Sequence, residues 1–409
     1  MTKKEYIFLS MNDFTKEGGG TIRILSILNS LAMKDHSVKF ISNAQDLSKF
    51  HPDIQHVSIN YKFTPQEKRK FQFLLSKFNY KVVNTFFSKL KKHFQQLLPD
   101  LTNKTIYTFE YLDNSMGYWL KQNKLIHSYI NDIHGVSTLE FDFQIKNNSS
   151  PLKKLVLRLK KNAAYSLDKK VLTNSSKNIF VTESMRSYFI QLYPQLEDRN
   201  YVILNNLVPP NAKPNTLRKD DATPVMNEYG IPKDSRIILF TGAFKLTGGV
   251  MVLIKAFELV KEDLENITLV LVGDGYERPN CEKYVQENNI DNIIFTGRTP
   301  YKLLPYFQAM ADVIVCPDTK NEFSKLVIHI KYIDALLSNR IVINGSHPSV
   351  MEINEKQRLS LTFEPSNEHD LAKTIEFAFA NYYELKDKYK FVSQIMLKEY
   401  AYLEQVEKI

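Results

Sequence analysis

The second half of the chain alternates short runs of apolar, β-branched residues with longer segments of helical periodicity. The runs are RIILFTG (236–242), ITLVLVG (267–273), NIIFTG (292–297), DVIVCP (312–317) and RIVING (340–345). Continuous apolar runs are typical of strands buried on both faces, and a helix after each strand returns the chain to begin the next strand in parallel. We therefore predict a parallel, doubly wound α/β sheet.

The first half repeats this alternation less regularly. Its strand candidates are EYIFLS (5–10), IYTFE (106–110), SYIND (128–132), NIFVT (178–182) and YVILNN (201–206). A chain of 409 residues is long enough for two domains. We therefore predict a second sheet of the same class in the first half.

A segment with four prolines and no periodicity, 208–224, separates the two halves and is predicted to be a linker. The domains on either side are then an N-terminal Rossmann-like domain, 1–207, and a C-terminal one, 225–385. We expect the helical segment 386–409 to pack back on the N-terminal domain.

The net charge of +9 is concentrated in two segments. Residues 62–104 hold ten basic and two acidic residues, and residues 146–178 hold nine basic and one acidic residue. Both segments interleave these charges with apolar residues at helical spacing. Two interpretations stay open: the segments bind an anionic membrane surface, or their apolar faces pack into the first domain while the lysines are solvated. A nucleic-acid partner is not expected, because no recognition motif accompanies the charge.

Three features of the sequence bear on where the protein is located. The first residues lack a signal-peptide core, no window is apolar enough to span a membrane, and the cysteines Cys281 and Cys316 are too few for a disulfide scaffold. We expect a cytoplasmic protein that associates peripherally with the inner face of the cell membrane.

Two motifs in the second half could carry chemistry. TGAFKLTGG places Lys245, Gly248 and Gly249 between a strand and a helix, where amides and a lysine suit a diphosphate; a simple tight turn is the alternative. Lys331 and Asp334 are three residues apart on one helix face, so the first could hold a phosphate and the second sugar hydroxyls; a surface ion pair is the alternative.

The order of the motifs resembles glycosyltransferase family 4, the retaining sugar-nucleotide enzymes with the two-domain GT-B fold. The resemblance is continuous over about 235–380. Its segments are TGAFKLTGG, LVLVGDG, FTGRTPYKLLPYFQAMADVIVCP, HIKYIDALLSNRIVI and FEPSNEHDLAKTI, with scattered support from GGGTIRILSILNSL, NDIHG and VTESMRSYF in the first half.

The resemblance implies two Rossmann-like domains facing across a cleft. It also implies metal-independent hexosyl transfer, with retention, from a nucleotide-diphosphate sugar to a glycan or lipid-linked acceptor. The expected pathway is cell-surface polysaccharide or glycolipid synthesis. The donor is a co-substrate, and neither a cofactor nor a metal is expected.

The resemblance also implies roles for single residues. Gly19 and Gly20 are similar to the acceptor-side glycine loop, and His134 resembles the histidine that contacts the transferred sugar, although a core or capping histidine is the alternative. Lys331 resembles a lysine beside the diphosphate. Asp334 stands where a glutamate holds the donor ribose.

The chain departs from the family pattern on the diphosphate loop. Ala243 and Thr247 occupy positions that are commonly basic or polar, so Lys245 or Arg298 could substitute.

A second departure concerns the paired carboxylates. Leu326 stands eight positions before Asp334, where the family has a glutamate, and Glu322 is the nearest acid. Three alternatives follow: Glu322 enters the donor site, donor affinity is weakened, or the protein is a catalytically degenerate GT-B chain that serves as a binding or scaffolding subunit.

Overall fold

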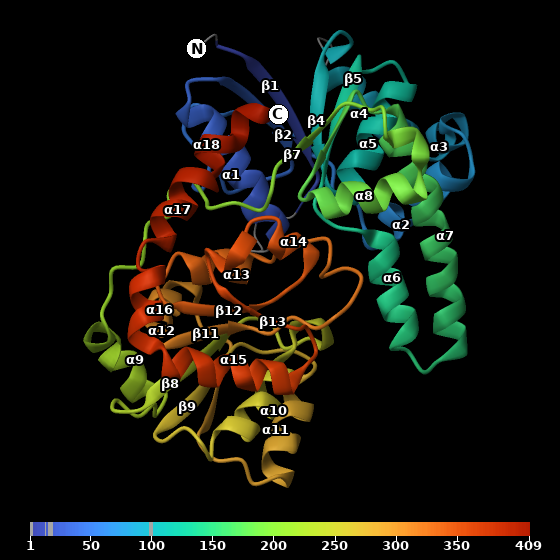
Figure 1. Cartoon of the computed structure of the whole chain (residues 1–409). Helices are drawn as coiled ribbons and strands as arrows, with labels where there is room; N and C mark the ends of the chain where they lie inside the picture. The colour runs from blue at the N-terminus through green and yellow to red at the C-terminus, as the bar shows by residue number, and fades with distance from the viewer. Residues whose placement is uncertain (1–2, 13, 15–18, 98–100) are drawn as a thin grey trace. The chain divides into compact units, whose positions relative to one another are not determined.

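The computed structural model describes residues 3–12, 14, 19–97 and 101–409. The chain forms two compact units (Figure 1): the first is Met1–Pro210 with Tyr402–Ile409, and the second is Asn211–Ala401. The boundary at Pro210 lies within the predicted linker. The predicted C-terminal segment 386–409 is divided, because only its last eight residues belong to the first unit.

The first unit is built on a seven-stranded sheet in the order β3-β2-β1-β4-β5-β6-β7. Its strands are β1 (Glu5–Ser10), β2 (Ser37–Ser42), β3 (Gln55–Ser58), β4 (Thr105–Phe109), β5 (Ser128–Ile133), β6 (Lys177–Phe180) and β7 (Tyr201–Ile203). All pairings are parallel. The strand order reverses between β1 and β4, which is where ligands bind in open α/β sheets.

Helices connect these strands. They are α1 (Gly19–Met33), α2 (Pro65–Lys77), α3 (Tyr80–Phe86), α4 (Ser88–Leu97), α5 (Glu110–Gln122), α6 (Ser137–Lys146), α7 (Pro151–Asn174), α8 (Glu183–Leu192) and the C-terminal α18 (Tyr402–Gln405). Thr64 caps α2 through a reciprocal capping box with Glu67, and Pro65 occupies the first turn, where it costs no hydrogen bond.

The basic segment 62–97 contributes to the core of the first unit. Phe71 and Phe94 lie edge-on to Trp119 with ring centroids 5.9 and 6.5 Å apart, and Leu75, like these three residues, is almost fully buried. The interpretation that apolar residues of this segment pack into the domain therefore holds for α2–α4.

The second unit is built on a six-stranded parallel sheet in the order β10-β9-β8-β11-β12-β13. Its strands are β8 (Arg236–Thr241), β9 (Ile267–Val272), β10 (Ile293–Gly297), β11 (Val313–Cys316), β12 (Ile341–Gly345) and β13 (Leu361–Phe363). Every residue of β9 is buried, as its continuous apolar run predicts. The order reverses between β8 and β11.

The helices of the second unit follow the strands. They are α9 (Thr223–Glu228), α10 (Val250–Val260), α11 (Arg278–Glu287), α12 (Leu304–Met310), α13 (Ile330–Leu336), α14 (Pro348–Met351), α15 (Glu368–Ala380), α16 (Tyr382–Tyr389) and α17 (Val392–Glu399). The predicted α/β class, with one Rossmann-like sheet in each half of the chain, is confirmed.

Candidate functional site

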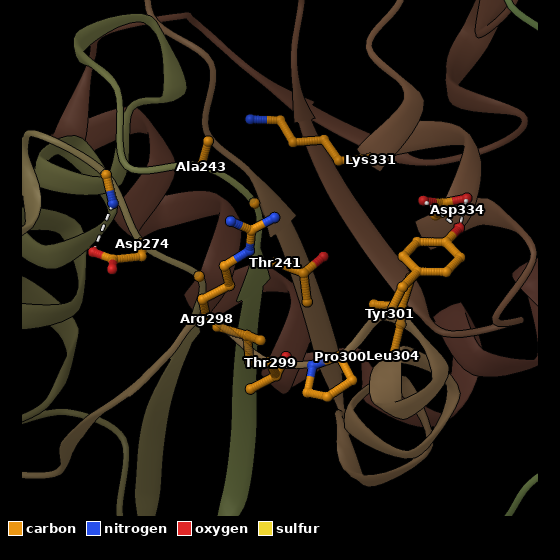
Figure 2. A pocket seen from close by; sticks show the side chains of 14 residues that line it. Thr241, Ala243, Asp274, Arg298, Thr299, Pro300, Tyr301, Leu304, Lys331 and Asp334 are labelled. Carbon is orange, nitrogen blue, oxygen red and sulfur yellow. Dashed lines mark hydrogen bonds between the residues drawn. The ribbon is translucent and has the colours of Figure 1, made fainter. Parts of the chain in front are cut away.

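A cavity of about 780 Å³ opens at the carboxyl ends of the strands in the second unit. This volume lies in the range of small-molecule sites, and the position beside the β8/β11 reversal is where such sites form. The charged or hydroxylated side chains that line it include Arg298, Tyr301, Lys331 and Asp334 (Figure 2).

Glycines bring backbone close to backbone around this cavity. Gly273 has φ +137°, and a Cβ there would lie 1.8 Å from the Gly242 carbonyl oxygen. Gly249 has φ +71°, and a Cβ there would lie 1.7 Å from the Pro317 carbonyl oxygen. Only glycine fits either position without moving the neighbouring loop.

The structure separates the predicted diphosphate-loop residues. Gly242 and Ala243 at its start line the cavity, whereas Gly248 and Gly249 are buried and Lys245 is exposed. A Thr319 amide donates to the Thr247 carbonyl at 3.0 Å, which ties the loop to the chain after β11.

Lys331 does not pair with Asp334, which contradicts the surface ion-pair interpretation. Its Nζ donates to Asp318 Oδ1 at 2.8 Å, and the Asp318 side chain is only 6% exposed. Burial alone would raise the pKa of Asp318, but the charges of Lys331 and His329 hold that pKa below its usual range. The sequence reasoning missed Asp318; the available signal was a carboxylate directly after the buried strand DVIVCP.

Asp334 instead accepts a hydrogen bond from the Tyr301 hydroxyl, which lies 3.2 Å from both carboxylate oxygens (Figure 2). Burial raises the pKa of Asp334 to about 6, and the hydrogen bond from Tyr301 opposes that rise. Tyr301, which lines the cavity, was also missed by the sequence reasoning, whereas Asp318 contacts a lining residue without lining the cavity itself. The segment of Tyr301, FTGRTPY, follows a strand, which is a usual place for ligand contacts.

Arg298, Lys245 and Glu322 were predicted to replace residues that the family has and this chain lacks, and the structure places them differently. Arg298 lines the same cavity as Ala243, and Figure 2 shows its guanidinium directed toward the side of the cavity where Ala243 and Thr241 are drawn. Glu322 is 60% exposed and pairs with Lys325 at 2.6 Å. Neither Glu322 nor Lys245 is among the described residues that line the cavity.

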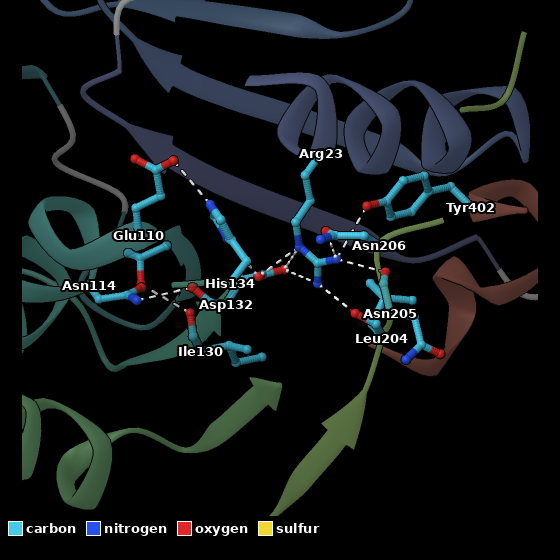
Figure 3. Close-up of polar contacts among 11 residues, drawn as sticks. Arg23, Glu110, Asn114, Ile130, Asp132, His134, Leu204, Asn205, Asn206 and Tyr402 are labelled. Carbon is cyan, nitrogen blue, oxygen red and sulfur yellow. Dashed lines mark hydrogen bonds and ion pairs between the residues drawn. The ribbon is translucent and has the colours of Figure 1, made fainter. Parts of the chain in front are cut away.

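In the first unit, His134 forms hydrogen bonds with two carboxylates (Figure 3). Its Nε2 lies 3.0 Å from Glu110 Oε1, and its Nδ1 lies 3.3 Å from Asp132 Oδ1. Burial alone would lower the pKa of His134, but hydrogen bonds to Asp132 and Glu110, together with their charges, raise it to about 9. The imidazole is therefore cationic at neutral pH.

Gly20 approaches this cluster from the start of α1. A Cβ on Gly20 would lie 1.9 Å from Glu110 Oε1 and 3.2 Å from His134 Nε2. Gly19, the first residue of α1, is exposed. Glu110 itself has φ +61°, an uncommon conformation for a residue with a side chain, at the point where β4 passes into α5. The structure thus brings Gly20 and His134 together, with Glu110 as an unforeseen member.

Arg23 fixes Asp132 from the opposite side (Figure 3). Its Nε and Nη2 donate to the two Asp132 oxygens at 2.9 Å each, and further hydrogen bonds reach the Leu204 and Asn205 carbonyls and the Tyr402 hydroxyl. The Arg23 side chain is fully buried. This ion pair orients the carboxylate that contacts His134. An arginine within the apolar run of α1 was the signal for it.

In the part of the chain that the structure describes, no group of three His, Cys, Asp or Glu side chains is placed to hold a metal ion.

Comparison with known proteins finds similarity to glycosyltransferases, above all in the second unit. Residues 221–393 match the family model described as glycosyl transferases group 1. The chain is 26% identical to the putative glycosyltransferase YtcC of Bacillus subtilis over 270 residues, which are 61% of this chain and 64% of that protein. It is 21% identical to the lipopolysaccharide 1,2-N-acetylglucosaminetransferase of Salmonella typhimurium over 188 residues, 44% of this chain and 46% of that protein. These alignments thus span less than two thirds of each relative.

Solved structures share the fold over almost the whole chain. A glycosyltransferase from Rickettsia africae superimposes with a TM-score of 0.66 at 15% identity. The alignment covers 100% of this chain and 97% of that one. Anabaena Alr3699/HepE in complex with UDP-glucose has a TM-score of 0.66 at 14% identity, covering 98% and 97%. The chain therefore has the GT-B type of α/β fold.

Proposed function

We propose that this protein is a retaining glycosyltransferase that moves a hexose from a nucleotide-diphosphate sugar to a hydroxyl of a glycan or lipid-linked acceptor. One observation carries the proposal. The cavity at the β8/β11 reversal combines two cations, Arg298 and Lys331, with the carboxylate of Asp334, within the segment that matches the glycosyltransferase family model. Complexes of the structural neighbour HepE with UDP and UDP-glucose support a donor of the same class.

The donor roles follow from charge. Arg298 and Lys331 would hold the diphosphate, and negative charge that develops on the leaving phosphate would be stabilised by these fixed cations without a metal ion. Asp334 would accept hydrogen bonds from ribose hydroxyls, in exchange for the Tyr301 hydroxyl that it binds now. Lys331 would exchange part of its contact with Asp318 for the diphosphate.

On the acceptor-side unit, we assign contact with the transferred sugar to His134. A protonated imidazole donates hydrogen bonds and cannot act as a base, so His134 would bind a sugar oxygen rather than remove a proton. The Nε2 that would make this contact now lies 3.0 Å from Glu110 Oε1, so the sugar oxygen would replace Glu110 as its partner.

The alternative is a degenerate GT-B chain that binds a partner subunit. Leu326, which is 7% exposed, favours that alternative because it supplies no carboxylate to the donor. Arg298 argues against it, since it supplies a cation to the cavity that Ala243 also lines.

Calorimetry with a panel of nucleotide sugars separates the two functions. We expect binding of one donor, weakened at least about tenfold by Lys331→Ala through loss of a charge-assisted contact. Lys283→Ala is the matched control, because Lys283 is 71% exposed and pairs only with Glu287 on α11 among the described residues. Donor consumption should fall in His134→Ala while donor binding persists. No donor binding by the unmodified protein would support the scaffolding alternative.

The second part of the proposal is location. We place the protein at the inner face of the cell membrane, in cell-surface polysaccharide or glycolipid synthesis. The basic segments and the similarity to a lipopolysaccharide glycosyltransferase support this placement.

A further inference from the structure

The structure treats the two basic amphipathic segments differently. In α2–α4 most of the apolar residues are buried in the core of the first unit, and three phenylalanines of this segment, Phe73, Phe78 and Phe86, remain 47, 47 and 54% exposed. In α7 most of the apolar residues of the first turns are exposed instead. Figure 1 shows α6 and α7 side by side, projecting from the sheet of the first unit as a hairpin.

The first half of α7 carries a continuous apolar stripe. Leu152, Leu155, Val156 and Leu159 are 72, 53, 43 and 57% exposed. Their spacing of three, four and seven residues places them on one face of the helix. Leu157, on another face, is buried. We call these four residues the α7 stripe.

The stripe ends where α7 reaches the body of the unit. Ala163, Ala164 and Leu167 are buried, and α7 packs there against α2 and α5. The exposed face is therefore confined to the hairpin tip. Exposure of four neighbouring large apolar side chains on a soluble surface is unfavourable unless another surface covers them.

Positive charge surrounds the stripe. Residues 146–161 contain six basic and no acidic residues. Helical geometry places Lys153 and Lys160 along one side of the stripe and Arg158 along the other. Lys161 pairs with Asp142 on α6, which fixes the two helices of the hairpin together.

This pattern selects one class of covering surface. A second copy of the chain docked through the same face would bring Lys153, Arg158 and Lys160 against the same three cations, which is repulsive. An anionic bilayer offers an apolar interior for the leucines and negative headgroups for the flanking lysines and arginine. Within the described residues no helix is long and apolar enough to cross a membrane, so the contact would be interfacial.

We infer that the α7 stripe docks the first unit on an anionic lipid bilayer, with the four apolar side chains inserted between headgroups and the basic residues at the phosphates. The inference rests on the membrane location in the proposed function and names the surface that provides it. It does not depend on the donor site, which lies in the other unit.

Vesicle flotation of the full chain tests the inference. The probes are vesicles of phosphatidylcholine alone and of phosphatidylcholine mixed with phosphatidylglycerol. We expect binding to the mixed vesicles only, reduced at least about tenfold by the double variant Leu155→Ser/Leu159→Ser, because each serine removes a large apolar contact. Phe377→Ser is the matched control on α15, since Phe377 is 51% exposed, and Phe73→Ser tests the other basic segment. Neither substitution should change binding.

Three results would overturn the inference: no preference for anionic vesicles, full binding by the double variant, or loss of binding in Phe73→Ser alone. Light scattering without lipid gives a further test. A change from oligomer to monomer in the double variant would show that the stripe joins copies of the chain. Calorimetry with the nucleotide sugar, on the same samples, reports folding of the donor unit. Failure there with normal flotation would count against glycosyl transfer and not against docking.

Discussion

Replacement of Arg23 by methionine should destabilise the first unit more than any surface substitution. The guanidinium is fully buried, binds both oxygens of Asp132, and also donates to the Leu204 and Asn205 carbonyls. Methionine fills much of the same volume but supplies none of these donors. The Asp132 carboxylate, 3% exposed, would then remain buried beside His134 alone.

The magnitude follows from the burial. Removal of one partner from a buried ion pair costs about 3–5 kcal/mol, because the other charge stays desolvated. Each carbonyl that loses its donor adds to the cost, while the remaining hydrogen bond from His134 to Asp132 reduces it. We therefore expect a loss of about 3–5 kcal/mol in the free energy of unfolding of the first unit.

The single tryptophan makes this loss measurable. Trp119 is the only tryptophan of the chain and is fully buried in α5, so its fluorescence reports unfolding of the first unit. With a urea slope of about 3 kcal/mol/M, the midpoint should fall by roughly 1–1.7 M. Lys104→Met is the control. The ion pair of Lys104 with Glu5 is 45% and 43% exposed, and such pairs contribute about 0–1 kcal/mol.

The double variant Arg23→Met/Asp132→Asn provides the second comparison. Removing both charges should recover part of the lost stability, because no unpaired ion is left in the core. Equal midpoints for Arg23→Met and Lys104→Met would refute the reasoning, since the buried network would then contribute no more than a surface pair.

Three further predictions concern other groups. The pKa of His134 is raised from 6.5 to about 9 in the folded protein, so its contribution to stability is complete below pH 6.5 and is lost as the pH rises through 9. Urea midpoints of the unmodified protein should therefore fall between these pH values. The fall should be smaller in His134→Gln. Gly249→Ala should lower the melting temperature of the second unit by far more than Gly230→Ala. Both glycines have φ near +70°, but the added Cβ would lie 1.7 Å from the Pro317 carbonyl oxygen at Gly249 and meet nothing within 4 Å at Gly230. Equal losses would contradict the steric argument. Asp318→Asn should tighten binding of the nucleotide-diphosphate sugar that the calorimetric panel identifies, about threefold or more, since it removes the negative charge that now neutralises Lys331. Weaker binding would show that the carboxylate is needed to position the lysine.

Much of the fold could be predicted because parallel strands buried on both faces leave a direct trace in the sequence. The run ITLVLVG became the fully buried β9, and the Gly-rich turn after RIILFTG became the junction of β8 and α10. The division of the C-terminal segment at Tyr402 had no such trace. It depends on which unit the last helices contact, and those contacts join residues hundreds of positions apart.

The candidate site was predictable only in part. Lys331 and Asp334 were identified from helical spacing, yet spacing did not reveal that each has a different partner, Asp318 and Tyr301. Arg298 and Lys245 were equal candidates in the sequence. Only the loop after β10 places Arg298 against the cavity.

The basic segments show the same division most clearly. The sequence by itself determined that 62–104 and 146–178 are basic and amphipathic, because charge and periodicity are properties of the local residues. Only the tertiary structure decided which apolar face is satisfied. Phe71 and Phe94 contact Trp119 in the core, whereas Leu155 and Leu159 remain 53% and 57% exposed. Burial depends on what the rest of the chain brings into contact, and a helical pattern cannot specify that.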